Sequence, residues 1–306
     1  MGTQTVAVSG ASGLVGGKLV GLLKSAGHTV LPISRRSADS STILWEAERG
    51  FLNPARLEGV DAIVHLAGEN IAAGRWSPAQ KQKIRDSRVQ GTRTLVESLR
   101  GLSNRPKTLV CASAIGFYGD RGEEVLDEQS TAGTGFLPDV CREWEAAAHV
   151  VPHDRVRVTT LRTGIVMSAA GGALKKQLPL FRLGVGGRLG NGQQWMSPIS
   201  LRDTVSAIIH VLVNDIVGPV NLVAPEPARN SEVTQAIARA VQRPALLPVP
   251  KFALAAVLAA RWWWLGRKLR KAQQAEQADV VEGEYRVVGA EVIEAAVIEQ
   301  PPQRRE

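Results

Sequence analysis

The sequence has only two cysteines, Cys111 and Cys141, among 306 residues. Two cysteines cannot build the disulfide framework of a small secreted domain, and neither lies in a CxxC or Cys/His spacing that predicts a zinc site. So few cysteines are typical of a protein from a reducing compartment. We therefore expect no bound metal and a cytoplasmic location.

Long hydrophobic runs are also missing. No apolar stretch reaches the ~18–20 residues of a membrane-spanning helix. The apolar stretch at residues 5–8 begins close to Met1, without the basic and hydrophobic regions of a secretion signal. Hydrophobic residues form 44% and charged residues 22% of the chain, a globular composition that excludes disorder as the main state.

The net charge of +8 is unevenly distributed, because residues 251–271 carry six basic residues and no acidic one. The rest of the chain mixes both signs, which suits an anionic small molecule as well as a nucleic acid. We predict a small-molecule substrate and no nucleic-acid partner, and the oligomeric state stays open.

Short β-branched runs alternate with longer helical patterns along the first half of the chain. This order is typical of βαβ units and predicts an α/β fold, a Rossmann-type doubly wound parallel sheet with a smaller C-terminal substrate-side region. Expected strands lie near 4–9, 29–34, 61–66, 107–112 and 156–162; expected helices lie near 14–26, 77–101, 138–150 and 230–242.

Three regions follow from this pattern. Residues 1–220 form the dinucleotide-binding domain, including a glycine-rich substrate-side loop at 164–200. Residues 221–271 form the small substrate-side region, and Gly218-Pro219, Pro225 and Pro227 punctuate the way into its helix at about 230–242. Residues 272–306, rich in Gln, Glu and Ala, are expected to be a loosely held or disordered tail.

A glycine-rich turn follows the first expected strand and opens the first expected helix. In such a turn Gly10 allows the tight bend, Gly13 lets the backbone approach a diphosphate, and Gly16 lets the helix pack on the strand. The free N–H groups at the helix start, Ser12, Leu14 and Val15 included, then offer an anion site. We interpret the turn as a dinucleotide phosphate site.

The second expected strand ends in Ser34, Arg35 and Arg36, where folds that prefer NAD place an acidic residue on the ribose 2′-hydroxyl. Two guanidinium groups can instead bind a 2′-phosphate. The sequence therefore predicts NADP(H) over NAD(H). Arg36 alone fits a solvated loop equally well.

Further motifs stand in order along the chain. They include His65-Leu66-Ala67-Gly68-Glu69-Asn70, Arg75-Trp76, Ser87-Arg88-Val89 with Thr92, Ser113-Ala114-Ile115-Gly116-Phe117-Tyr118-Gly119, Trp144-Glu145, Leu161-Arg162-Thr163-Gly164-Ile165-Val166 and Asn221-Leu222-Val223-Ala224-Pro225. With the glycine turn they resemble the extended short-chain dehydrogenase/reductases over about residues 4–255. More narrowly, they resemble the nucleoside-diphosphate-sugar epimerase-like or cell-division-inhibitor-like subfamily.

The resemblance implies more cofactor contacts than the spacing alone. Ser34 and Arg35 would meet the adenosine phosphate, and Arg88 would meet the phosphates from its helix. The other implied contacts come from the loop after the third expected strand and from a position near the nicotinamide: Leu66, Ala67, Gly68, Glu69 and Ile165.

The superfamily's Tyr-x-x-x-Lys pair is absent. When Glu145 is aligned with the acidic residue that commonly follows the pair, the two positions fall on Leu137 and Cys141. Either another group transfers the proton, or the reaction needs no strong acid, or the protein binds the cofactor without turnover. We select Ser113 and Tyr118 as catalytic candidates, and Glu69 and Glu145 are further candidates for proton transfer.

On the substrate side, basic groups, amides and an aromatic residue gather around the glycine-rich loop, and they suit a phosphorylated or carboxylated substrate. The residues selected are Arg162, Arg188, Gln194 and Trp195.

The region 252–271 contains three consecutive tryptophans, Trp262–Trp264, beside its basic residues. Two interpretations stay open: a weak contact with an anionic membrane surface, or a helix that packs its tryptophans on the domain. Two functions also stay open. The first is an NADP(H)-dependent oxidoreductase or epimerase, and the second is a regulatory or scaffold protein that uses NADPH as a ligand.

Overall fold

The computed structural model describes residues 2–35, 41–46, 49–151 and 156–245. They belong to one compact unit, Met1–Leu247. Arg36, the 252–271 region and the 272–306 tail lie outside the described residues, as does about half of the substrate-side region predicted at 221–271, from residue 246 onward.

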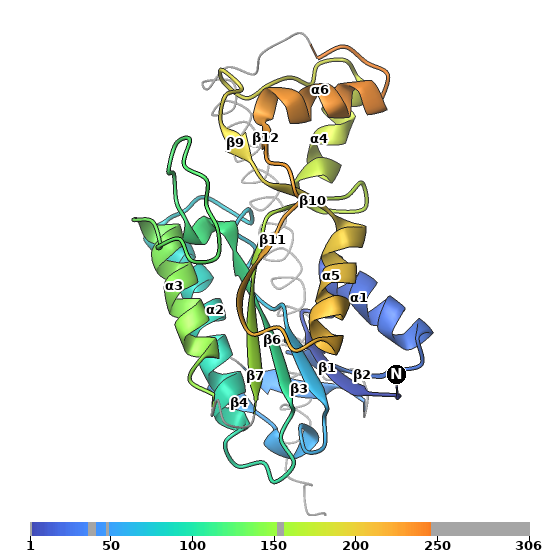
Figure 1. The fold of residues 1–306 in the computed structure, drawn as a ribbon, viewed down its shortest axis with the longest axis vertical. Coiled ribbons are helices and arrows are strands. Elements are labelled where there is room, and N and C mark those ends of the chain that lie inside the picture. The colour runs from blue at the N-terminus through green and yellow to red at the C-terminus, as the bar shows by residue number, and fades with distance from the viewer. Residues whose placement is uncertain (1, 36–40, 47–48, 152–155, 246–306) are drawn as a thin grey trace, which may run out of the picture. The chain divides into compact units, whose positions relative to one another are not determined.

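An eight-stranded sheet forms the centre of this unit, in the order β11-β7-β6-β5-β1-β2-β3-β4 (Figure 1). All neighbours are parallel except β3 and β4. The strands are β1 (Thr5–Ser9), β2 (Thr29–Ser34), β3 (Ile43–Glu46), β4 (Phe51–Leu52), β5 (Ala62–His65), β6 (Thr108–Ala114), β7 (Arg157–Thr163) and β11 (Gly218–Leu222).

Helices cover both faces of the sheet (Figure 1). On one face lie α2 (Pro78–Ser98) and α3 (Phe136–Ala148), and on the other lie α1 (Leu14–Ser25) and α5 (Leu201–Val213). Successive strand residues point to opposite faces. One core therefore contains Ala7, Ile63 and Leu109 with α2 and α3, and the other contains Val6, Val64 and Val110 with α1 and α5. The Rossmann-type parallel sheet predicted from the sequence is confirmed.

A smaller group of elements follows the carboxyl ends of β7 and β11. It consists of two-stranded pairs, β8 (Ile165–Met167) with β10 (Pro198–Ser200) and β9 (Trp195–Met196) with β12 (Ala228–Arg229), and of helices α4 (Gly172–Arg182) and α6 (Asn230–Ala240). Figure 1 shows α4, α6, β9 and β12 together at one end of the drawing. A Cβ on Gly171, the N-cap of α4, would lie 2.8 Å from the Leu14 side chain, so this group of elements adjoins the start of α1.

The five predicted strands and the helices predicted near 14–26, 77–101, 138–150 and 230–242 are present, with ends shifted by up to three residues. The interpretation of Gly218-Pro219 as loop punctuation is wrong, because both residues belong to β11. Strand β11 pairs only with β7, so Pro219 sits on a sheet edge, where a missing N–H is tolerated. The predicted domain boundary at 220/221 falls inside this strand.

Candidate functional site

The glycine turn between β1 and α1 is shaped as the sequence predicts. Gly10 has a φ of +68°, and a Cβ there would lie 3.0 Å from the Leu66 backbone. A Cβ on Gly16 would lie 2.2 Å from the Gly10 carbonyl oxygen, so only glycine lets α1 pack on the turn. Gly13 donates its N–H to that oxygen at 2.9 Å.

The N-terminus of α1 is open to an anion. Gly13 is the N-cap, and no side chain caps the helix or places an acidic group in its first turn. The N–H groups at Leu14 and Val15 begin the helix, and Ser12 is exposed beside them. A helix start with unsatisfied N–H groups and a positive dipole end favours a phosphate. The turn therefore has the shape and the donors that a diphosphate requires.

The loop after β5 is fastened to the same turn. Leu66 and Ala67 donate their N–H groups to Ser9 Oγ at 3.0 and 3.1 Å. Ser9 Oγ also lies 2.7 Å from Nδ1 of His65, and Nε2 of His65 lies 3.1 Å from Thr92 Oγ1. This loop lies at the carboxyl ends of β1 and β5, where the strand order reverses; open α/β sheets bind their ligands at such a point.

Arg88 lies against the same loop from α2. Its Nη1 donates to the carbonyl oxygens of Glu69 and Ile84 at 3.0 and 3.1 Å, and a Cβ on Gly68 would lie 3.2 Å from the guanidinium carbon. Burial lowers the pKa of Arg88. Within the described residues no carboxylate forms an ion pair with it. Arg88 is thus a half-buried cation available to a phosphate.

At the end of β2, Ser34 is half-buried and Arg35 is exposed. Across the described part of the chain, Arg35 has no ion-pair partner. Its guanidinium is therefore available at the position where the sequence predicts a 2′-phosphate contact.

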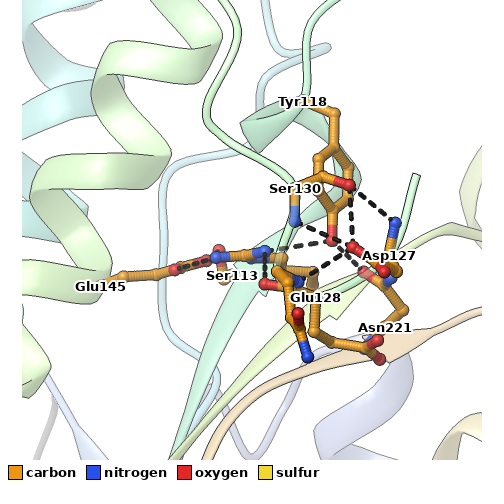
Figure 2. Close-up of polar contacts among 9 residues, drawn as sticks. Ser113, Tyr118, Asp127, Glu128, Ser130, Glu145 and Asn221 are labelled. Carbon is orange, nitrogen blue, oxygen red and sulfur yellow. Dashed lines mark hydrogen bonds and ion pairs between the residues drawn. The ribbon is translucent and has the colours of Figure 1, made fainter. Parts of the chain in front are cut away.

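A second group of polar residues forms a row across the carboxyl ends of three strands. Ser113 on β6 is in register with Arg162 on β7, which is in register with Asn221 on β11. The Arg162 side chain is almost fully buried and forms a two-point ion pair with Glu145 of α3, with both N···O distances at 2.9 Å. Ser113 Oγ donates to the same carboxylate at 2.6 Å. Figure 2 shows Ser113 and Glu145 side by side.

This pair is held from several sides. The Arg162 guanidinium stacks on Phe117 at 3.6 Å and donates to the Glu128 carbonyl at 3.1 Å. Burial opposes the charge on Arg162, but hydrogen bonds to Glu145 and Tyr118 raise its pKa. Each of its three nitrogens donates to an internal partner, so the geometry gives no support to the substrate contact that the sequence predicts for Arg162.

The predicted catalytic residue Tyr118 belongs to the same network (Figure 2). Its hydroxyl donates to Asn221 Oδ1 at 2.5 Å and accepts from Arg162 Nη1 at 3.0 Å. The side chain is buried. Because its proton is directed at Asn221, Tyr118 is poorly placed to donate a proton to a substrate.

The positions that align with the superfamily's Tyr-x-x-x-Lys pair face the turn after β6. A Cβ on Gly116 would contact Leu137 at 3.6 Å and the Cys141 sulfur at 3.8 Å. Burial, together with the nearby Glu145 charge, raises the pKa of Cys141 to about 11. The thiol is therefore protonated near neutral pH and packs as an apolar group.

The other predicted residues lie in the smaller group of elements. Ile165 begins β8 and is half-buried, with its N–H donated to the Ser197 carbonyl at 2.9 Å. Arg188 is exposed. The Gln194 side chain donates to the Leu189 carbonyl at 3.1 Å.

The Trp195 side chain contacts other residues of the same chain. The Arg229 guanidinium stacks on its ring at 3.7 Å, and its indole N–H donates to Glu123 at 3.1 Å. Arg229 also forms an ion pair with Glu123 at 2.5 Å. The loop between η3 (Ile115–Phe117) and α3, which holds Glu123, thus contacts β9.

Sequence reasoning missed three parts of the site: the Glu145–Arg162 ion pair, the contribution of Asn221, and the hydrogen bond between Ser9 and His65. A partial signal existed for the first of these. Ser113 and Arg162 lie at the carboxyl ends of two strands that the sequence predicts, and the ends of neighbouring parallel strands meet at one sheet edge.

The described residues contain neither a candidate metal site nor a candidate membrane span. No group of three or more His, Cys, Asp or Glu side chains there is placed to hold a metal ion. None of the helices in that part of the chain has the length and apolar run that crossing a bilayer requires.

Comparison with known proteins gives consistent matches. Residues 6–224 match the sequence model of the NAD dependent epimerase/dehydratase family. An epimerase family protein of Mycobacterium bovis is 45% identical over 258 residues, covering 84% of this chain and 85% of the relative. One from Bacillus subtilis is 33% identical over 262 residues, covering 83% and 86%. The crystal structure of human epimerase family protein SDR39U1 with NADPH has a TM-score of 0.76 at 32% identity, covering 83% of this chain and 85% of that one.

Proposed function

Because the chain belongs to the NAD dependent epimerase/dehydratase family, we propose that it binds NADP(H) and acts as an oxidoreductase or epimerase on a small, anionic substrate. The observation that carries this proposal is the glycine turn, in which Gly10 and Gly16 leave no room for a Cβ and the start of α1 is uncapped. When bound, NADP(H) supplies or accepts the hydride.

The choice of NADP(H) over NAD(H) rests on the cations around the turn. Arg35 has no ion-pair partner within the described residues, and a guanidinium there suits a 2′-phosphate. Arg88 is a second cation, half-buried beside the loop after β5, for the diphosphate. The human relative whose structure contains NADPH supports the same choice.

Among the predicted catalytic residues, we favour Ser113 as the group that meets the substrate. Its hydroxyl proton is directed at Glu145, so toward a substrate its oxygen can act only as a hydrogen-bond acceptor. An acceptor recognises a substrate hydroxyl rather than a carbonyl. Glu145, held by Arg162, then fixes the orientation of Ser113.

A second candidate function is a regulatory or scaffold protein that binds NADPH without turnover. The specific observation in its favour is that Leu137 and the protonated thiol of Cys141 occupy the positions of the superfamily's catalytic pair. Stereospecific exchange of hydride between NADPH and a panel of small carbonyl compounds and alcohols separates the two functions. Exchange with any member supports the enzyme, and cofactor binding without any exchange favours the scaffold.

The cofactor is tested by calorimetric titration of NADPH and NADH into the wild type and Arg35→Asp. A charge-assisted contact contributes about 1.5–3 kcal/mol, so NADPH affinity should fall about ten- to a hundredfold, with little change for NADH. Arg93→Asp, which makes the same charge change on an exposed position of α2, is the matched control. An equal loss for both dinucleotides would contradict the 2′-phosphate contact, and no binding to the wild type would refute the function.

A further inference from the structure

A buried chain of hydrogen bonds connects the glycine turn to the loop after β5. Ser9 ends β1, His65 ends β5 beside it in register, and Thr92 lies on α2 above them. All three side chains are completely buried. The Trp45 ring packs edge-on against the His65 ring, with centroids 5.5 Å apart, and closes the side of the chain.

The donors and acceptors in this chain determine which nitrogen of His65 carries the proton. A serine hydroxyl has one proton and two lone pairs. The N–H groups of Leu66 and Ala67 occupy both lone pairs of Ser9 Oγ. The hydroxyl proton must therefore point to Nδ1 of His65, 2.7 Å away.

Since Nδ1 is an acceptor, the neutral ring carries its proton on Nε2 and donates it to Thr92 Oγ1 at 3.1 Å. Complete burial favours this neutral form. If Nδ1 gained a proton, it would point at an oxygen without a free lone pair, and one contact of Ser9 would be lost.

From this arrangement we infer that His65 and Ser9 are positioning residues that hold the loop after β5 in place for the cofactor. The inference rests on the proposed function. Leu66 and Ala67 are residues that we expect to line the cofactor, and their backbone lies within 3.1 Å of where a Cβ on Gly10 would be. Ser9, which directly precedes the glycine turn, therefore connects this turn to the loop after β5. His65 accepts the Ser9 hydroxyl proton and so keeps both lone pairs of Ser9 Oγ turned toward the loop.

The inference is tested with three variants and two measurements. Ser9→Ala removes the hydroxyl that accepts both loop N–H groups, and leaves Leu66 only its longer contact, at 3.3 Å, with the Ser9 carbonyl oxygen. His65→Leu removes the acceptor that orients the Ser9 hydroxyl. The matched control, Thr92→Val, breaks the far end of the same buried chain but leaves Ser9 and the loop in contact. The measurements are NADPH affinity by calorimetry and the melting temperature.

We expect Ser9→Ala and His65→Leu to weaken NADPH binding by about tenfold, the equivalent of one to two net hydrogen bonds. Thr92→Val should lower the melting temperature but change affinity less than about twofold. If the loss of NADPH affinity is proportional to the loss of melting temperature across all three variants, the hydrogen bonds from Ser9 through His65 to Thr92 have only a structural role. If His65→Leu does not fold, Ser9→Ala against Thr92→Val makes the same comparison.

A third measurement does not need the cofactor. Long-range proton–nitrogen NMR on histidine-labelled wild type should show His65 protonated at Nε2 and unprotonated at Nδ1 near neutral pH. The amide resonances of Leu66 and Ala67 should shift in Ser9→Ala and stay in place in Thr92→Val. An Nδ1–H tautomer, or amides indifferent to Ser9, would overturn the inference. If the wild type does not bind NADPH, the proposed function is refuted. The NMR result then decides by itself whether His65 and Ser9 hold the loop after β5.

Discussion

Substitution of Gly16 by alanine should damage both the stability of the protein and its proposed cofactor site. The new Cβ would lie 2.2 Å from the carbonyl oxygen of Gly10, which is backbone and cannot rotate away. Relief requires α1 and the turn to separate by about 1 Å, because unbonded carbon and oxygen atoms do not approach within about 3 Å. This oxygen also accepts the N–H of Gly13, so the shift distorts the whole turn.

The size of the effect follows from two opposing contributions. Overpacking of a tight contact costs about 1–3 kcal/mol, and alanine is favoured over glycine inside a helix by about 1 kcal/mol. Gly21→Ala isolates the second contribution, because Gly21 is exposed in the same helix and a Cβ there would meet nothing within 4 Å. The free energy of unfolding should therefore be about 1–3 kcal/mol lower in Gly16→Ala than in Gly21→Ala.

The two variants are compared by urea denaturation and by calorimetric titration with NADPH. Displaced N–H groups at the start of α1 should weaken binding about ten- to a hundredfold, since a hydrogen bond to a charged group is worth about 1.5–3 kcal/mol. Gly21→Ala should bind like the wild type and be slightly more stable. The reasoning fails if both variants match in stability and bind NADPH equally well.

Three further predictions concern buried groups. Burial lowers the pKa of His65 from 6.5 to about 4, so the unfolded chain binds its proton first as the pH falls, and His65 should cost about 3 kcal/mol of stability between about pH 7 and pH 4. Across this pH range, the free energy of unfolding measured by denaturation should change less with pH in His65→Leu than in the wild type. Arg162→Met leaves the Glu145 carboxylate buried without its cation and should lower the free energy of unfolding by about 3–5 kcal/mol. The double variant Arg162→Met with Glu145→Gln should recover part of this stability. No recovery would show that the two residues do not act as a pair. Burial raises the pKa of Cys111 to about 12 and that of Cys141 to about 11, so iodoacetamide should alkylate them only after unfolding, and rapid labelling of the native protein would contradict the buried geometry.

Five strands of the sheet and the glycine turn could be predicted because their signals are local. A strand that is apolar on both faces, such as Ala62–His65, identifies itself by composition, and the glycines after β1 stand at fixed spacing before a helix. Strand β11 could not be predicted in this way. Its Gly218-Pro219 start resembles a turn, and only its place at the sheet edge makes a proline acceptable.

In the candidate site, too, features that depend on nearby residues could be predicted, and features that depend on distant residues could not. By itself, the sequence predicted strands β1, β2, β5, β6 and β7, helices α1, α2, α3 and α6, the turn at Gly10 and the cation Arg35, since each depends on neighbours a few residues away. Only the tertiary structure decided that Glu145 pairs with Arg162, that the Tyr118 hydroxyl donates a hydrogen bond to Asn221, and that His65 orients Ser9. Those partners are 17, 103 and 56 residues apart in the chain. Which side chains meet there depends on strand order and register, which no local pattern of residues encodes.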